Sequence, residues 1–267
     1  MPIKKIITRD VIFSDNVAID VLGYIKKVYS YPEVFSYIEE HLLRFLFTAS
    51  YVKKTFNKFI KILDIGSGLP FLPGYLSLNG FENINTIEMG KLTFDTTWKV
   101  QSCMLDIEEQ PFPYADESFD LILLLEVFEH LYKRPNHVFR EIQRVLKQGG
   151  TLVISTPNGG GLGRHLKCLF NGRFGMPIYD FSSDYEKRGQ FAHIREYSIQ
   201  EIKNYLKHFD FSIKKIIFNY FPMMHITNNW QMRHTRNKVK RFIGVIRKIF
   251  WFLPVFQTNI FLIANKR

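Results

Sequence analysis

Three acidic residues stand where apolar, β-rich runs of the sequence end, and the first of them opens a glycine-rich turn. Asp64 lies in the run at residues 60–65 and is followed by Gly66, Ser67 and Gly68. Glycines let a ligand approach the backbone closely, and open α/β sheets bind their ligands at the carboxyl ends of strands. The pattern predicts a nucleotide-type binding loop, but alone it does not say which nucleotide.

Glu88 and Asp106 end the next two β-rich runs, at residues 84–88 and 102–105. A carboxylate at Glu88 could accept both hydroxyls of a ribose. Asp106 could accept from an adenine amino group while Ile107 lies against the ring. The alternatives are a solvated strand-end acid at Glu88 and an ordinary turn aspartate at Asp106.

A nicotinamide dinucleotide is the main competing ligand for such a site. Its fingerprint would need a third glycine at position 71, where this sequence has Phe71. The Tyr-x-x-x-Lys pair of short-chain reductases is also absent from the sequence. These two features disfavour a nicotinamide-dependent oxidoreductase.

These residues need a framework of alternating strands and helices to hold them. Helical periodicity and β-rich runs predict a series of helices and four more strands. A helix or helical pair is expected over 31–58, further helices over 73–79, 136–146 and 198–209, and the strands over 121–125, 151–155, 213–219 and 259–264. Gly149 and Gly150 are expected to end the third helix. Strands that alternate with helices indicate a parallel sheet.

Several motifs between about residues 60 and 158 occur together in the order and spacing of one family. They occupy residues 62–68, Asp106 with 111–113 and 117–120, 126–131, 144–150, and 155–158. In this combination the chain resembles the class I S-adenosylmethionine-dependent methyltransferases of the Methyltransferase-11 and Methyltransferase-23 groups. The resemblance implies a doubly wound, Rossmann-like, mostly parallel seven-stranded sheet and S-adenosylmethionine as the cofactor.

The resemblance also implies a role for each cofactor-binding residue. Asp64 and the loop of Gly66, Ser67 and Gly68 would lie near the methionine part, with Glu126 lining the same side. The nucleoside part would be bound by Glu88 at the ribose and by Asp106 and Ile107 at the adenine. Where the family often has a further glycine, this chain has Leu69 and Pro70, which changes the wall of the cofactor pocket.

The methyl acceptor has two candidate clusters for acid–base work. A sulfonium methyl group is already an electrophile, so the protein mainly aligns the acceptor and keeps water out. A hydroxyl acceptor also needs a base. Glu129 and His130 follow the run 121–125 and could supply one, or they could simply cap or pair at the next helix.

The second cluster is the run at residues 193–197, which similar methyltransferases often carry near the acceptor pocket. His193 could act as the base, Arg195 as an anion clamp, and Tyr197 as a wall or hydrogen-bond donor. The alternative is a helix N-cap at Ser198, with Arg195 paired to Glu196 or Glu201.

The chain of 267 residues suits one α/β domain with additions. We expect a helical extension over 1–58 and a class I methyltransferase domain over 59–267. Within that domain, 158–193 is interpreted as a lid-like or substrate-binding insertion. A basic amphipathic segment occupies 233–253.

The net charge of +11 favours an anionic partner. The segment 233–253 could lie on an anionic membrane surface, which would suit a lipid-linked acceptor, or its apolar stripe could pack on the core. No nucleic-acid recognition motif accompanies the charge. Neither a signal peptide nor a membrane span is expected. Cys103 and Cys168, which lack metal-ligand spacing, favour a reducing cytoplasm over an oxidising compartment.

The sequence thus predicts methyl transfer from S-adenosylmethionine to a small-molecule, sugar or lipid-linked acceptor, with oxygen favoured over carbon or nitrogen. No metal ligand set is expected. A protein that kept the fold and the cofactor but lost catalysis is the alternative from another class.

Overall fold

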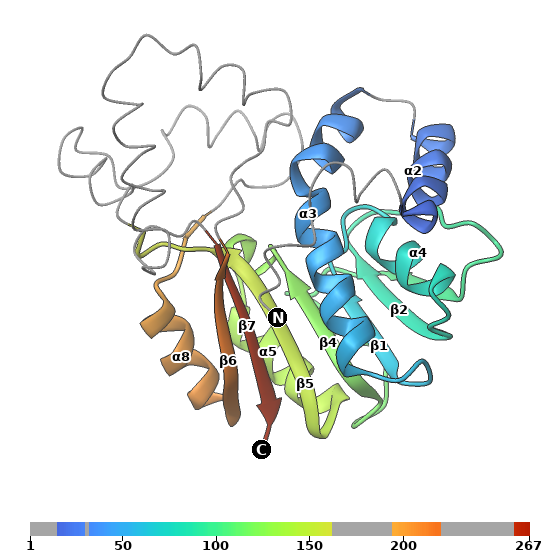
Figure 1. Ribbon diagram of the computed structural model, residues 1–267. Helices are drawn as coiled ribbons and strands as arrows, with labels where there is room; N and C mark the ends of the chain where they lie inside the picture. Colours follow the sequence, from blue (N-terminus) through green and yellow to red (C-terminus); the bar gives the residue numbers. More distant parts are fainter. Residues whose placement is uncertain (1–14, 30–31, 162–193, 220–258) are drawn as a thin grey trace, which may run out of the picture. The chain divides into compact units, whose positions relative to one another are not determined.

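The computed structural model describes residues 15–29, 32–161, 194–219 and 259–267 (Figure 1). His193, most of the predicted insertion and the whole basic segment 233–253 lie outside these residues. The chain divides into two compact units, with the boundary between Leu105 and Asp106.

The first unit contains three helices and three parallel strands in its described part. Two of its helices, α2 and α3, pack on the third, α4 (Figure 1). The bounds are α2 (Asn16–Val28), α3 (Pro32–Thr55), β1 (Lys61–Ile65), α4 (Phe71–Leu78), β2 (Asn83–Glu88) and β3 (Val100–Met104). β2 lies between β1 and β3 and pairs in parallel with both. The ends of β1 and β2 therefore share one edge, where Asp64 is paired with Thr86.

The second unit carries four strands and the residues predicted for the acceptor. Its elements are β4 (Phe119–Leu125), the 3-10 turn η2 (Phe128–His130), α5 (Pro135–Val145), β5 (Leu146–Pro157), α8 (Ile199–His208), β6 (Phe211–Asn219) and β7 (Asn259–Lys266). β4 and β5 are parallel, whereas β7 pairs antiparallel with both β5 and β6.

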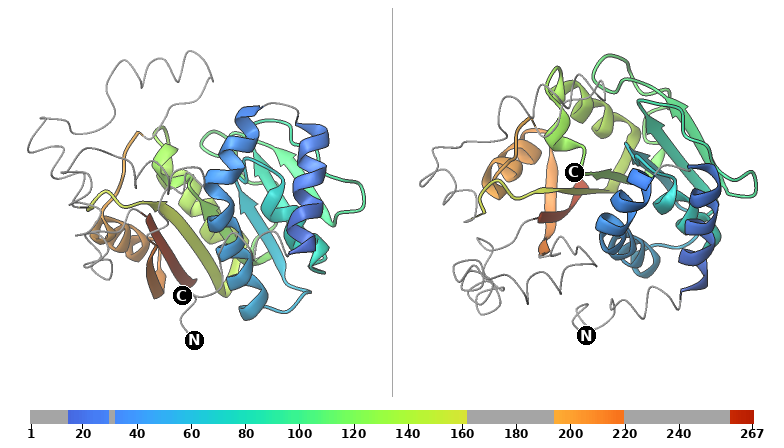
Figure 2. Two further views of the ribbon diagram at one scale, coloured as in Figure 1. Left: turned by 45° about the horizontal axis from the view of Figure 1, so that its top comes forward. Right: turned by 90° about the horizontal axis from the view of Figure 1, so that it is seen from above.

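Aromatic side chains join the two helices of the second unit. The ring centroids of Phe139 in α5 and Tyr205 in α8 lie 4.9 Å apart, and those of Phe139 and Phe209 lie 5.7 Å apart. The two helices accordingly lie side by side (Figure 2). Rings at these separations contribute attraction beyond the area they bury, so these contacts stabilise the packing of α8 on α5.

The strand order is β3-β2-β1-β4-β5-β7-β6. β7 runs antiparallel to both of its neighbours, whereas the pairs β1–β2, β2–β3 and β4–β5 are parallel. This is the mostly parallel, Rossmann-like seven-stranded fold predicted from the sequence. In β4, Leu121, Ile122, Leu123 and Leu124 have no exposed surface, as a strand covered on both faces requires.

The glycine pair at residues 149–150 does not end the third predicted helix, and that prediction is wrong. The helix α5 ends before Leu146, which already belongs to β5. From β7, Lys266 donates to the carbonyl of Leu146 at 2.8 Å and Asn265 donates to that of Gly149 at 2.7 Å. Side chains distant in the sequence thus hold this stretch as strand. Gly149 takes a φ of +71° there.

Among the residues described, no helix combines the length and the apolar character that crossing a membrane requires.

Candidate cofactor and acceptor site

The glycine-rich loop joins β1 to α4 in the first unit. Gly66 and Gly68 have φ values of +69° and +66°, a region that side-chain-bearing residues rarely adopt. A Cβ added at Gly68 would meet nothing within 4 Å, so its backbone angle, and not lack of space, requires glycine. Gly66 donates its N–H to the carbonyl of Ile87 at 2.8 Å, which ties the loop to β2.

Asp64 is a buried carboxyl group near the end of β1. Only 2% of the residue is exposed, and neither carboxyl oxygen has a hydrogen-bond partner in the part of the chain that the structure describes. Burial, followed by the nearby Glu88 carboxylate, raises the pKa of Asp64 well above its ordinary value. A buried polar group without a partner is costly, so this position suits a ligand that brings a cation or a donor. The ammonium and sulfonium groups of S-adenosylmethionine fit that requirement.

Glu88 ends β2 and faces the loop instead of solvent. The residue is 5% exposed, which contradicts the alternative of a solvated strand-end acid. Its carboxylate accepts from the Ser67 N–H at 3.0 Å, the Ser67 hydroxyl at 2.5 Å and the Gly68 N–H at 3.2 Å. Burial raises the pKa of Glu88, and the hydrogen bonds from Ser67 and Gly68 oppose that rise.

Asp106 and Ile107, the predicted adenine residues, open the second unit. Asp106 accepts from the Glu108 N–H at 3.0 Å, so it does stabilise a turn as the alternative interpretation held. Its other oxygen lies 3.4 Å from Nζ of Lys133, which also pairs with Glu109 at 3.0 Å. Ile107 is buried. Lys133 is a neighbour of the adenine candidate that sequence reasoning missed.

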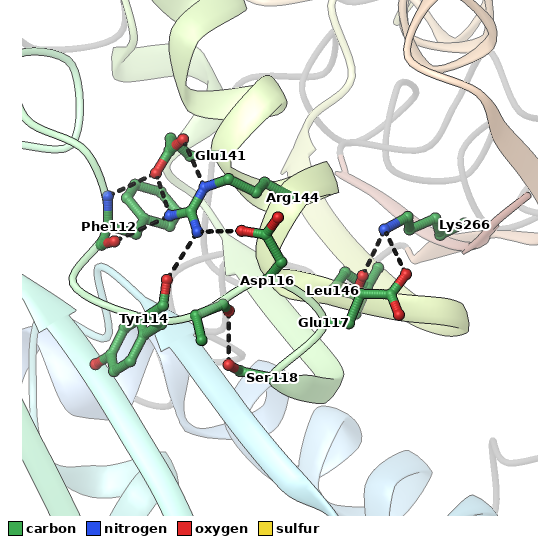
Figure 3. Close-up of polar contacts among 10 residues, drawn as sticks. Phe112, Tyr114, Asp116, Glu117, Ser118, Glu141, Arg144, Leu146 and Lys266 are labelled. Carbon is green, nitrogen blue, oxygen red and sulfur yellow. Dashed lines mark hydrogen bonds and ion pairs between the residues drawn. The ribbon is translucent and has the colours of Figure 1, made fainter.

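Arg144 holds the segment that follows the adenine candidates. Its guanidinium donates to the carbonyls of Phe112 and Tyr114 and to the carboxylates of Asp116 and Glu141, at 2.7–3.0 Å (Figure 3). Glu141 in turn accepts from the Phe112 N–H at 2.7 Å. The hydrogen bond from Arg144, the largest influence, lowers the pKa of Glu141. A planar fork of donors suits this set of acceptors, so Arg144 shapes the segment.

Glu126 directly follows β4 and has a φ of +56°, an uncommon conformation for a residue with a side chain. Its N–H donates to the carbonyl of Ser155 at 2.8 Å, and the Ser155 hydroxyl donates to Oε1 of Glu126 at 2.8 Å. Asn259 lies 3.5 Å from the same oxygen. β5 and β7 therefore fix both the backbone and the carboxylate of Glu126.

Glu129 and His130 are the first pair of candidate acid–base residues. Glu129 has no exposed surface, and its Oε2 accepts from the Thr156 hydroxyl at 2.9 Å. Its carbonyl accepts from the N–H groups of Ile194 and Arg195, at 3.0 and 3.4 Å. Thr156 and the segment that begins at residue 194 thus hold Glu129 through both its side chain and its backbone. His130, half-buried at the end of η2, is the more accessible of the two.

The second candidate cluster follows the alternative interpretation at two of its residues. Ser198 is the N-cap of α8 and forms a capping box with Glu201. Arg195 pairs with Glu201 at 2.5 Å, so its guanidinium is already engaged with a carboxylate. Tyr197 stacks on Phe128, with ring centroids 4.4 Å apart. The contacts of Tyr197 with Phe128 and of Ile194 and Arg195 with Glu129 bring the two candidate clusters together. Nothing in the sequence indicated that they are neighbours.

Gly159 is a second residue that sequence reasoning missed. Its N–H donates to the carbonyl of Tyr197 at 3.0 Å, which links the described residues on either side of 162–193. A Cβ at this position would lie 2.5 Å from the carbonyl oxygen of Glu196, closer than such atoms can approach. The glycine-rich run at 159–161 was a signal for close backbone approach, but the sequence does not name the partner.

The described residues contain no group of three or more His, Cys, Asp or Glu side chains arranged to hold a metal ion.

Residues 63–154 match a family model described as a methyltransferase domain. The ubiquinone biosynthesis O-methyltransferase of Rickettsia prowazekii (strain Madrid E) is 29% identical over 117 residues, covering 40% of this chain and 44% of that protein. The match therefore spans less than half of the relative's length.

Solved methyltransferase structures share the fold. An S-adenosylmethionine-dependent methyltransferase from Mesorhizobium loti aligns with a TM-score of 0.52 at 14% identity, covering 81% of this chain and 96% of that one. One from Methanosarcina mazei aligns with a TM-score of 0.51 at 17% identity and the same two coverages, 81% and 96%. At these identities the likeness concerns the fold. The domain match shows a methyltransferase domain over residues 63–154, and the motifs within it are those of class I S-adenosylmethionine-dependent methyltransferases, which implies S-adenosylmethionine as the cofactor.

Proposed function

We propose that the protein transfers the methyl group of S-adenosylmethionine to a hydroxyl oxygen of a small-molecule, sugar or lipid-linked acceptor. The observation that carries methyl transfer is the buried Asp64 carboxyl, which has no partner within the described residues and stands beside the glycine-rich loop. The choice of oxygen is supported by the relative from Rickettsia prowazekii, whose name records an O-methyltransferase.

The residues divide the work by their chemistry. S-adenosylmethionine supplies a methyl group on a positively charged sulfur. Asp64 and Glu88 are suited to hold the polar groups of the cofactor, because one lacks a partner and the other points at the loop. An acceptor hydroxyl must give up its proton, and His130, half-buried in the turn whose Phe128 stacks on Tyr197, is a described side chain that could take it. His193 is proposed for the same task.

The acceptor itself is proposed to bind among residues 158–193 and the run that follows them. Support comes from two backbone hydrogen bonds, Gly159 to Tyr197 and Ile194 to Glu129, which hold the described residues on either side of 162–193 in place.

A transfer assay with a methyl-labelled cofactor tests the proposal. The purified protein is incubated with 13C-methyl S-adenosylmethionine and, separately, with a catechol acid, a free sugar and a polyprenylated phenol in detergent. We expect a labelled methoxy carbon in one product by NMR. A label on nitrogen or carbon would contradict the oxygen assignment.

The main rival is a protein that binds the cofactor without catalysis. It predicts saturable binding of S-adenosylmethionine but no S-adenosylhomocysteine with any acceptor or with a cell extract. Calorimetric titration beside the transfer assay separates these outcomes. A titration with a nicotinamide dinucleotide, which we expect to produce no binding heat, covers the oxidoreductase alternative.

We also propose a cytoplasmic location with contact to anionic membrane through residues 233–253. The net charge of +11 and the basic, apolar-striped composition of this segment support it. The full chain should sediment with vesicles of phosphatidylglycerol and not with vesicles of phosphatidylcholine. Equal binding to both, or to neither, would contradict the membrane proposal.

A further inference from the structure

The two carboxylate oxygens of Glu88 are engaged unequally. Oε1 accepts two hydrogen bonds, both from Ser67, through its N–H at 3.0 Å and its hydroxyl at 2.5 Å. Oε2 accepts one longer bond, from the Gly68 N–H at 3.2 Å. Ser67 therefore fixes one oxygen of the carboxylate, while the other is held less closely.

An ionised carboxylate has about four acceptor sites, two on each oxygen. The bonds from Ser67 fill both sites of Oε1, and the Gly68 bond fills one site of Oε2. One site on Oε2 is left for a ligand. The two hydroxyls of a ribose would need two sites, so both can bind only if a bond from the loop is released.

The longest of the three bonds is the one that can be released at least cost. The N–H and the hydroxyl of Ser67 both bond to Oε1, so freeing that oxygen would break two bonds, whereas freeing Oε2 breaks one. Glu88 is only 5% exposed, so water hardly competes for these contacts. The Gly68 bond, at 3.2 Å, is the weakest by length.

We propose that Ser67 is a positioning residue that clamps Oε1 of Glu88 and so directs Oε2 at the ribose, and that Gly68 gives up its bond to Oε2 when both ribose hydroxyls bind. The inference rests on the proposed function, in which Glu88 binds the ribose of S-adenosylmethionine. It adds that Oε1 is held by Ser67 while Oε2 binds the ribose, and that the Ser67 side chain sets this difference.

Binding measurements with four ligands test the clamp without an acceptor. S-adenosylhomocysteine, adenosine, 2′-deoxyadenosine and 3′-deoxyadenosine are titrated calorimetrically into the wild-type protein and into Ser67→Ala. We expect the Kd of S-adenosylhomocysteine to rise about tenfold in the variant, the usual effect of losing a hydrogen bond to a charged group. The preference for adenosine over both deoxyadenosines should shrink, because Oε2 of Glu88 is no longer oriented toward the ribose hydroxyls.

Two further variants separate positioning from general structure. Ser67→Thr keeps a hydroxyl and should restore both the affinity and the ribose preference. Ser77→Ala removes a hydroxyl that accepts from the Lys99 N–H at 2.7 Å, away from the loop, and should leave the affinity for all four ligands unchanged. Wild-type discrimination in Ser67→Ala, or equal losses in Ser77→Ala, would overturn the proposal.

Amide NMR on the wild-type protein tests the exchange of partners even if Ser67→Ala fails to fold. On addition of S-adenosylhomocysteine, the Gly68 amide proton should move upfield as its bond to Oε2 is lost. The Ser67 amide should keep its position. If the Gly68 signal stays while that of Ser67 moves, the assignment of the two oxygens is wrong.

Discussion

The cofactor loop in the first unit and the turn at η2 in the second are both rich in buried polar groups, but they satisfy them differently. In the loop region, Asp64 has no hydrogen-bond partner among the described residues, and Oε2 of Glu88 has one acceptor site open. Around η2, Oε2 of the buried Glu129 accepts from the Thr156 hydroxyl, and the exposed Arg195 pairs with Glu201. The contrast suggests that the first region is built to receive a ligand and the second to hold itself together.

The largest effect expected from this contrast is the loss of Glu88. Glu88→Ala removes the acceptor of three hydrogen bonds and leaves the loop donors without partners. We expect the Kd of S-adenosylhomocysteine to rise about a hundredfold, because several charge-assisted bonds are lost at once. Calorimetry measures it. The control is Glu82→Ala, which replaces an exposed acid of the same unit. An equal loss of affinity in that variant would show that Glu88 has no particular role in binding the cofactor.

Removing a partner near η2 should affect stability and spare cofactor binding. Thr156→Val keeps the shape of a side chain with no exposed surface but deletes the hydroxyl that donates to Glu129 at 2.9 Å. We expect a loss of about 1–3 kcal/mol in the free energy of unfolding, the cost of leaving a buried acceptor unsatisfied. Urea denaturation measures it. A tenfold loss of S-adenosylhomocysteine affinity with normal stability would break the comparison.

Asp64→Asn should change stability and affinity in opposite directions. The pKa of Asp64 is raised by burial and by Glu88, so the folded protein holds this proton more tightly than the unfolded chain. Stability from this group is present at acid pH and is lost as the pH rises from the ordinary value of 3.8 through the raised pKa.

An amide in place of the carboxyl group removes that titration, so the Asp64→Asn variant should lose less stability than wild type across the same pH interval. Its affinity for S-adenosylhomocysteine should fall about tenfold, because a charged partner is lost. Thermal unfolding at a series of pH values and calorimetry at neutral pH provide the two readings. Parallel pH profiles for both proteins would show that Asp64 does not titrate as described.

The smallest effect is expected at Arg195, because its partner Glu201 is exposed. Side chains of the pair are 63% and 44% exposed, and such pairs contribute less than about 1 kcal/mol. Arg195→Ala should therefore barely shift the unfolding midpoint. If the KM of an identified acceptor rises severalfold while stability is unchanged, Arg195 is the anion clamp after all.

The sequence predicted what depends on short patterns. The three acids at strand ends, the glycine-rich turn and the cap at Ser198 are local signals, and each lies where its pattern indicated. The end of the third helix was predicted within one residue, at Leu146, but the glycine pair at residues 149–150 lies in β5 and does not end the helix. β7 side chains more than a hundred residues later bond to this stretch, which the local pattern could not reveal.

Contacts between distant residues were beyond the sequence for the same reason. Nothing in the local pattern joins Arg144 to Phe112, Gly159 to Tyr197 or Ser155 to Glu126, since the fold alone brings each pair together. Ser67 shows the intermediate case. Its place in the loop was visible, but its hold on one oxygen of Glu88 depends on the register of β1 and β2.

Hydrogen–deuterium exchange with and without S-adenosylhomocysteine tests the central contrast most directly, because it reports both regions in one experiment. We predict slower exchange over residues 64–68 taken together and at the end of β2, because the bound ligand covers the loop, with the smallest gain at Gly68, whose bond to Glu88 is released. Little change is expected at residues 194–198, where the Ile194 and Arg195 amides are bonded to Glu129 away from the loop. Protection at 194–198 without any at 64–68 would contradict this prediction.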